Sequence, residues 1–158
     1  MQEKLQKLLE QAYELCEDGN YVMALEYYDI SLDIEPDNLN VMVDKGVTLQ
    51  NLGRFNEALR MYEKALSTEP ENLDALINKG SVLHTLKNYS GAISCYDAAL
   101  DHDKRNAIAL AYKGLSIGEM GDMPSAIKYF KKALRMDQDY DLAQISLLTA
   151  KNILKNMS

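Results

Sequence analysis

The stretch LNVMVDKGVTLQNLGRFNEALRMYEKALSTEPEN, residues 39–72, is followed by a second version of itself, LDALINKGSVLHTLKNYSGAISCYDAALDHDKRN, residues 73–106. Each is 34 residues long, and the same register holds without a gap from Leu5 to Tyr140. The chain therefore contains four units, at about 5–38, 39–72, 73–106 and 107–140. A fixed period of this size indicates a stack of repeated units rather than a globule built around one central site.

Three columns of the register keep their chemical character from unit to unit. They are a glycine column (Gly46, Gly80, Gly114), an alanine column (Ala24, Ala58, Ala92, Ala126) and an aromatic column (Tyr28, Tyr62, Tyr96, Phe130). Small residues at fixed positions allow two helices to approach closely. We expect Gly46 to face Ala58 across a helix pair, with the ring of Tyr62 filling the space that the small residues leave.

Each unit predicts two helices joined by a turn. In the second unit, residues 39–52 and 55–68 carry apolar residues at helical spacing. Between them, Gly53 is expected to end the first helix in a left-handed conformation. The third unit has Lys87 in this column, so either the lysine adopts that strained conformation or Asn88 takes over its role.

Each junction between units carries signals that stop one helix and start the next. Pro36 ends a helix, and the Asp or Asn after it caps the following one. The later junctions lack proline, but Asn106 offers a cap at the third, and Asp139 or Asp141 at the fourth.

The columns resemble the tetratricopeptide repeat (TPR) family. In the second unit, its small, large and proline positions are matched by Gly46, Ala58, Ala65, Phe55, Tyr62 and Pro70. The resemblance covers about residues 5–138. It implies an all-α, right-handed α-solenoid of helix-turn-helix repeats, forming a single domain over residues 1–158. It also implies that the chain is a protein-protein interaction scaffold.

The chain departs from the family pattern where the family usually has leucine. Lys45, Lys79 and Lys113 stand there, each directly before the column glycine. We expect their aliphatic stems to pack while their ammonium groups reach solvent.

The two ends of the chain also carry information. A final amphipathic helix is expected at about 141–156, capping the stack with a polar outer face. The first ten residues lack the apolar core of a secretion signal, and no stretch is long and apolar enough for a membrane span. Cys16 and Cys95 lie in different units and different columns, so we expect no disulfide and a cytoplasmic location.

The net charge of −7 is unevenly distributed. Residues 5–38 contain nine acidic residues and one lysine, whereas the later units are nearly neutral or weakly basic. Nucleic acid is disfavoured as a partner because phosphate binding needs a cationic surface. We expect a monomer. The alternative is a structural solenoid that self-assembles head to tail, the acidic head of one copy meeting the basic tail of the next.

No motif for chemistry is visible. The chain has two histidines, His84 and His102, and lacks metal-binding spacings and glycine-rich phosphate loops. We therefore expect no enzyme activity, no cofactor and no metal.

The resemblance implies a concave groove lined by the first helix of each unit. Carried over residue by residue, the expected partner-binding residues are Leu9, Glu10, Tyr13, Glu17, Val43, Asp44, Val47, Asp74, Asn78, His84, Tyr112, Leu115 and Glu119. Some of these are expected to be buried between neighbouring first helices. The groove positions carry five acids and neither lysine nor arginine, so we expect a basic, amphipathic peptide or helix as the partner.

Some family members bind the C-terminal carboxylate of large chaperones with a clamp of lysine, asparagine and arginine. In either frame of this chain, the clamp positions retain one asparagine, Asn78, and no basic residue. The sequence thus argues against a co-chaperone of that type.

Overall fold

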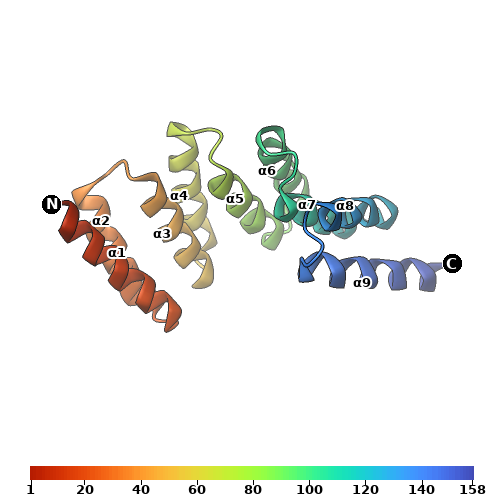
Figure 1. Ribbon diagram of the computed structural model, residues 1–158, viewed down its shortest axis with the longest axis horizontal. Coiled ribbons are helices and arrows are strands. Elements are labelled where there is room, and N and C mark those ends of the chain that lie inside the picture. The colour runs from red at the N-terminus through yellow and green to blue at the C-terminus, as the bar shows by residue number, and fades with distance from the viewer. The chain divides into compact units, whose positions relative to one another are not determined.

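The computed structural model describes all of residues 1–158. The chain forms nine helices joined by short turns and has no strands (Figure 1). The helices are α1 (Gln2–Glu17), α2 (Tyr21–Ile34), α3 (Leu39–Asn51), α4 (Phe55–Thr68), α5 (Leu73–Thr85), α6 (Tyr89–His102), α7 (Ala107–Glu119), α8 (Met123–Met136) and α9 (Asp141–Met157). They form two compact units: an N-terminal unit, Met1–Pro70, with α1–α4, and a C-terminal unit, Glu71–Ser158, with α5–α9. None of these helices is both long and apolar enough to cross a membrane.

The first helices of the second, third and fourth repeats begin with the same asparagine cap. In each, the side-chain oxygen accepts a hydrogen bond from the backbone N–H three residues on: Asn38 from Val41 (3.1 Å), Asn72 from Ala75 (2.9 Å) and Asn106 from Ala109 (2.9 Å). Helix α9 breaks the pattern, because Tyr140 stands in the asparagine column and the helix has no side-chain cap. The prediction that Asp139 or Asp141 would cap it was wrong.

The turns inside the repeats use the left-handed conformation. Gly19, Gly53 and Gly121, which share one column of the 34-residue register, have φ of +74°, +73° and +94°, as expected for Gly53. Lys87 adopts it as well, with φ of +63°. Asn88 instead caps α6 by accepting a hydrogen bond from the N–H of Gly91 (3.0 Å). Of the two alternatives for this turn, the strained lysine is the one adopted.

Replacing Lys87 with glycine should relieve this strain. The left-handed conformation costs a non-glycine residue about 1–2 kcal/mol. The flexibility of glycine in the unfolded chain offsets part of the stability that removing this strain would add. We expect Lys87→Gly to raise the free energy of unfolding by about 0.5–1 kcal/mol, measured by urea denaturation. The control is Lys128→Gly, in the exposed interior of α8, which should lower it by about 1 kcal/mol. A loss of stability in Lys87→Gly would contradict the conclusion that Lys87 is strained in the left-handed conformation.

Each column glycine lies under the aromatic ring of its own repeat. A Cβ atom on Gly46 would be 2.5 Å from Cε1 of Tyr62, and one on Gly80 would be 2.5 Å from Cε1 of Tyr96. The expectation that Gly46 faces Ala58 is therefore corrected: its nearest neighbour is the ring. The prediction that Tyr62 fills the space left by small residues is confirmed, since this tyrosine is fully buried.

Lys45 and Lys113 form ion pairs instead of extending into solvent. Nζ of Lys45 lies 2.5 Å from Asp29 Oδ1, and Nζ of Lys113 lies 2.5 Å from Asp97 Oδ1. Burial opposes the charged form of Lys113, but its hydrogen bonds raise its pKa overall. The prediction was wrong for this pair of lysines because the second helix of the preceding repeat supplies an aspartate opposite each. The ion pairs tie α2 to α3 and α6 to α7.

Helix α9 covers the end of the fourth repeat with small residues. Ala143 and Ala150 are 0% and 4% exposed, and Ala150 packs with Ala126 and Phe130 of α8. The outer face of α9 is only partly polar, because Leu148 is 63% exposed among exposed polar residues such as Gln144, Lys151 and Lys155. The helix therefore ends the core while leaving apolar side chains uncovered.

Candidate partner-binding surface

In the N-terminal unit, two expected groove residues bind each other. The hydroxyl of Tyr13 donates a hydrogen bond to Asp44 Oδ2 (2.7 Å), and its ring meets Tyr28 edge to face at 6.4 Å. Partial burial, together with the bond to Asp44, raises the pKa of Tyr13 to about 12. Asp44 is half-buried. Its carboxylate is already engaged within the chain.

The other expected residues of the N-terminal unit differ in exposure. Val43 is only 7% exposed, so it packs in the core. The expectation that Val43 contacts a partner is corrected accordingly. Leu9 packs against the core cluster of the first repeat, and Val47 is half-buried. Glu10 and Glu17 are exposed. This part of the surface offers carboxylates more than apolar contacts.

The C-terminal unit has a pocket of about 270 Å³ between α5 and α7, here called the α5–α7 pocket. It is lined by Ser81, His84, Thr85, Tyr96, Tyr112, Leu115 and Leu142. Two of the rings are held in place by neighbours. His84 Nδ1 lies 2.8 Å from Ser116 Oγ, and Tyr112 meets Tyr96 edge to face at 5.9 Å.

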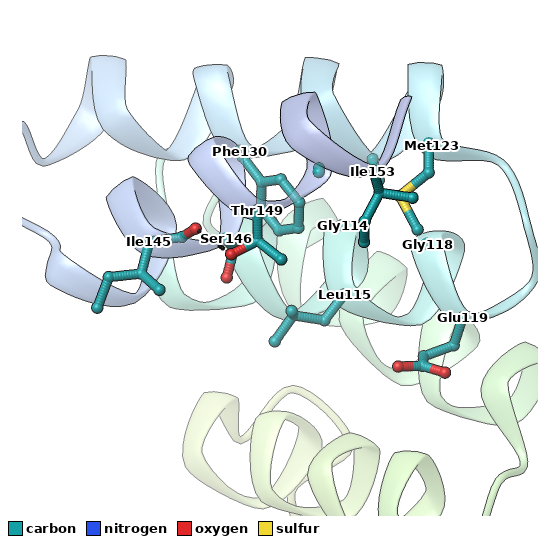
Figure 2. A pocket seen from close by; sticks show the side chains of 12 residues that line it. Gly114, Leu115, Gly118, Glu119, Met123, Phe130, Ile145, Ser146, Thr149 and Ile153 are labelled. Carbon is teal, nitrogen blue, oxygen red and sulfur yellow. Dashed lines mark hydrogen bonds between the residues drawn. The ribbon is translucent and has the colours of Figure 1, made fainter. Parts of the chain in front are cut away.

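A second pocket of about 170 Å³, the α7–α9 pocket, adjoins the first through the shared residue Leu115. It is lined by Gly114, Leu115, Gly118, Glu119, Met123, Ala126, Phe130, Ile145, Ser146, Thr149, Ala150 and Ile153. Figure 2 shows Leu115 and Glu119 of α7 on one side and the side chains of α9 on the other. Glu119 is the single charged residue in the lining, and most of the others are apolar.

The expected groove residues of the C-terminal unit separate into two groups. His84, Tyr112, Leu115 and Glu119 line these pockets. Asp74 and Asn78 line neither. The side-chain amide of Asn78 donates a hydrogen bond to the backbone oxygen of Asp74 (2.8 Å), and the Asp74 side chain is exposed.

Sequence reasoning missed the contribution of α9. Continued past Tyr140, the 34-residue register places Ile145, Thr149 and Ile153 in the columns of Ala111, Leu115 and Glu119. All three line the α7–α9 pocket. The signal was present in the sequence, but it was obscured by treating α9 only as a cap. In this register, α9 occupies the position of the first helix of a fifth repeat.

The linings of the two pockets suit the binding of apolar groups. No group of three or more His, Cys, Asp or Glu side chains converges as a metal site would require. Cys16 and Cys95 are not joined in a disulfide. The pockets instead present apolar side chains beside a single carboxylate, which can hold apolar side chains of another molecule.

Solved structures with the same fold span most of the chain. A crystal structure of the protein MamA is 21% identical, with a TM-score of 0.79, covering 96% of this chain and 83% of MamA. The Pseudomonas aeruginosa protein PilF is 20% identical, with a TM-score of 0.87, covering 98% of this chain and 71% of PilF.

A further match is the first TPR domain of RPAP3 (Spaghetti), solved with the HSP90 peptide SRMEEVD. It is 21% identical, with a TM-score of 0.70, covering 74% of this chain and 93% of the domain. At these identities, the three similarities concern the fold alone, and they support the all-α solenoid predicted from the repeats.

No curated protein sequence matches the chain. The family model for the tetratricopeptide repeat matches residues 43–101 and 86–141. Together the two matches span more than half of the sequence, and they include the glycine, alanine and aromatic columns of three repeats. The chain belongs to the tetratricopeptide repeat family.

Proposed function

We propose that this TPR chain is a scaffold whose C-terminal unit holds the apolar side chains of a partner's peptide or amphipathic helix. TPR proteins act as interaction scaffolds, which gives the general function. The observation that carries the proposal is the α7–α9 pocket, where the exposed Ile145 lies across from Leu115. The proposal assigns no catalytic step to the chain.

The apolar lining argues for a protein partner. Contiguous apolar surface with a polar rim marks interaction sites on otherwise charged proteins. Ile145 and Ile153, 65% and 39% exposed, would lose most of their contact with water under a bound helix. An amphipathic helix places its apolar residues on one face at helical spacing, as a groove of this kind requires.

Charge argues for a basic partner. Glu119 is the only charged side chain lining the α7–α9 pocket, and Glu10, Glu17 and Asp74 are exposed at the other expected groove positions. Within the C-terminal unit, a lysine or arginine beside the apolar anchors would pair with Glu119. Such charges mainly set the rate of encounter and the choice of partner, while buried apolar contacts set the lifetime of the complex.

The RPAP3 domain binds an acidic HSP90 peptide, which makes that peptide a useful contrast. The positions of its carboxylate clamp in this chain carry no basic residue. We therefore expect the acidic peptide SRMEEVD to bind far more weakly than a basic amphipathic helix.

The test is a titration by fluorescence anisotropy with a synthetic helical peptide that carries leucines at helical spacing and flanking lysines. Ile145→Glu should weaken binding of this peptide by about tenfold or more, because it puts a carboxylate into the apolar pocket. Leu148→Glu is a matched control: Leu148 lies on the same helix, is similarly exposed and lines neither the α5–α7 nor the α7–α9 pocket.

The proposal predicts normal binding for the control and a loss for Ile145→Glu. Equal affinities for the two variants would place the working surface elsewhere. Tighter binding of SRMEEVD than of the basic peptide would contradict the proposed partner chemistry.

A further inference from the structure

A separate cleft lies between α6 and α8 of the C-terminal unit, outside the two pockets described above. It encloses about 670 Å³, and it is here called the basic cleft. Four cationic side chains line it together with two acidic ones: Lys104, Lys113, Lys132 and Arg135 with Asp97 and Asp101. Its apolar lining includes Leu100, Leu110 and Met136.

The cleft keeps a positive surplus after its internal pairing. Lys113 and Asp97 neutralise each other at 2.5 Å. The ring of Tyr129 lies between two ammonium groups, 4.6 Å from Lys113 Nζ and 4.8 Å from Lys132 Nζ. Lys104, Lys132 and Arg135 are all exposed and face a single further acid in the lining, Asp101. The basic cleft is thus a cationic, partly apolar surface on a chain of net charge −7.

The N-terminal unit presents exposed apolar and acidic side chains on α2, and two of them, Val22 and Glu26, line a cleft that also holds Arg54 and Arg60. Three apolar residues of α2 are unusually exposed: Val22 (61%), Met23 (46%) and Ile30 (44%). Glu26 and Asp33 are exposed at helical spacing among them. These five residues form the acidic face of α2. Asp29 is left out of this set because it is paired with Lys45.

We propose that the acidic face of α2 of one copy docks into the basic cleft of a second copy. Glu26 and Asp33 would meet Lys132 and Arg135, and the exposed apolar residues of α2 would cover the apolar lining of the cleft. The contact is heterologous, because each copy supplies a different surface. It uses none of the residues that line the α5–α7 and α7–α9 pockets, so it stands apart from the proposed partner binding.

Two features of the chain favour a second copy as the occupant. The charges are complementary, since the acidic residues are concentrated in residues 5–38 and the cleft lies near the other end of the chain. Both surfaces also carry exposed apolar side chains beside their charges: Val22, Met23 and Ile30 on α2, and Met136 (38% exposed) at the cleft. Exposed ion pairs are individually weak, so the association should be weak and sensitive to salt.

Sedimentation velocity of the full chain at several concentrations tests the proposal. At low salt, the average mass should rise with concentration. In salt near 1 M, where the Debye length falls from about 10 Å to about 3 Å, the chain should return to a monomer. Lys132→Glu with Arg135→Glu should weaken the association by about tenfold or more, as should Glu26→Lys with Asp33→Lys.

Two further variants make the test specific. Lys128→Glu with Lys131→Glu changes the net charge equally on the same helix, but these lysines do not line the cleft and should have little effect. The fourfold variant Glu26→Lys, Asp33→Lys, Lys132→Glu, Arg135→Glu restores complementarity and should regain association. A wild type that is monomeric at every concentration would overturn the proposal. A fourfold variant that stays monomeric would also overturn it. So would an equal loss of association in the control variant Lys128→Glu with Lys131→Glu.

Discussion

Gly80→Leu is expected to lower the free energy of unfolding by about 1–3 kcal/mol or more, because it overpacks a helix crossing. Even the first added atom has no room: a Cβ atom at Gly80 would lie 2.5 Å from Cε1 and 2.8 Å from Cζ of Tyr96. The ring cannot easily move aside, since Tyr96 is 1% exposed and its edge packs against Tyr112. The new side chain would therefore force α5 away from α6.

The matched comparison uses another helical glycine of the same unit. A Cβ atom at Gly118 would meet Met123 Cε at 3.5 Å, which is an ordinary contact. Gly118→Ala should raise the free energy of unfolding by about 0.5–1 kcal/mol, because alanine is the better helix former. Gly80→Ala should lower it. Both variants are measured by urea denaturation. Equal effects of Gly118→Ala and Gly80→Ala would disprove the close packing of the Tyr96 ring on Gly80.

The repeat columns predicted the helix pairs and the turns because local structure follows from local sequence. Glycine at a helix end and asparagine before the next helix act within a few residues of their own position. Contacts between helices are harder to predict. The partner of Gly46 is decided by the reach of the Tyr62 ring, and the partner of Lys45 is an aspartate on another repeat. Neither follows from the period alone.

The candidate surface was only partly predictable for a related reason. The period places Val43 and Asp44 in groove columns, but their exposure depends on how closely the neighbouring first helices pack. Val43 is consequently buried, and the Asp44 carboxylate is bound by Tyr13. His84, Tyr112, Leu115 and Glu119 do line the pockets of the C-terminal unit. The contribution of α9 was missed because the register was not continued past Tyr140.

Removing residues 141–158 is expected to disorder the end of the C-terminal unit and cause aggregation. Without α9, Ala126, Phe130 and Ala133 of α8 would lose the cover that Ala143 and Ala150 provide. A terminal repeat with an uncovered apolar edge is not independently stable. Light scattering and amide hydrogen exchange of α7 and α8 provide the measurements. A truncated chain that stays monomeric with unchanged exchange would contradict this role.

A point variant tests the packing of α9 against α8 without removing any residues. Ala150 is 4% exposed against α8, so Ala150→Glu would bury an unpaired carboxylate, and α9 should detach at a cost of about 3 kcal/mol or more. Leu148→Glu introduces the same charge two residues earlier on the exposed side and should leave α9 docked. Because α9 also forms one wall of the α7–α9 pocket, Ala150→Glu should lose both the exchange protection of α9 and the binding of the basic peptide. Loss of protection with unchanged binding would show that the partner does not use α9, and the proposed site would then have to lie elsewhere.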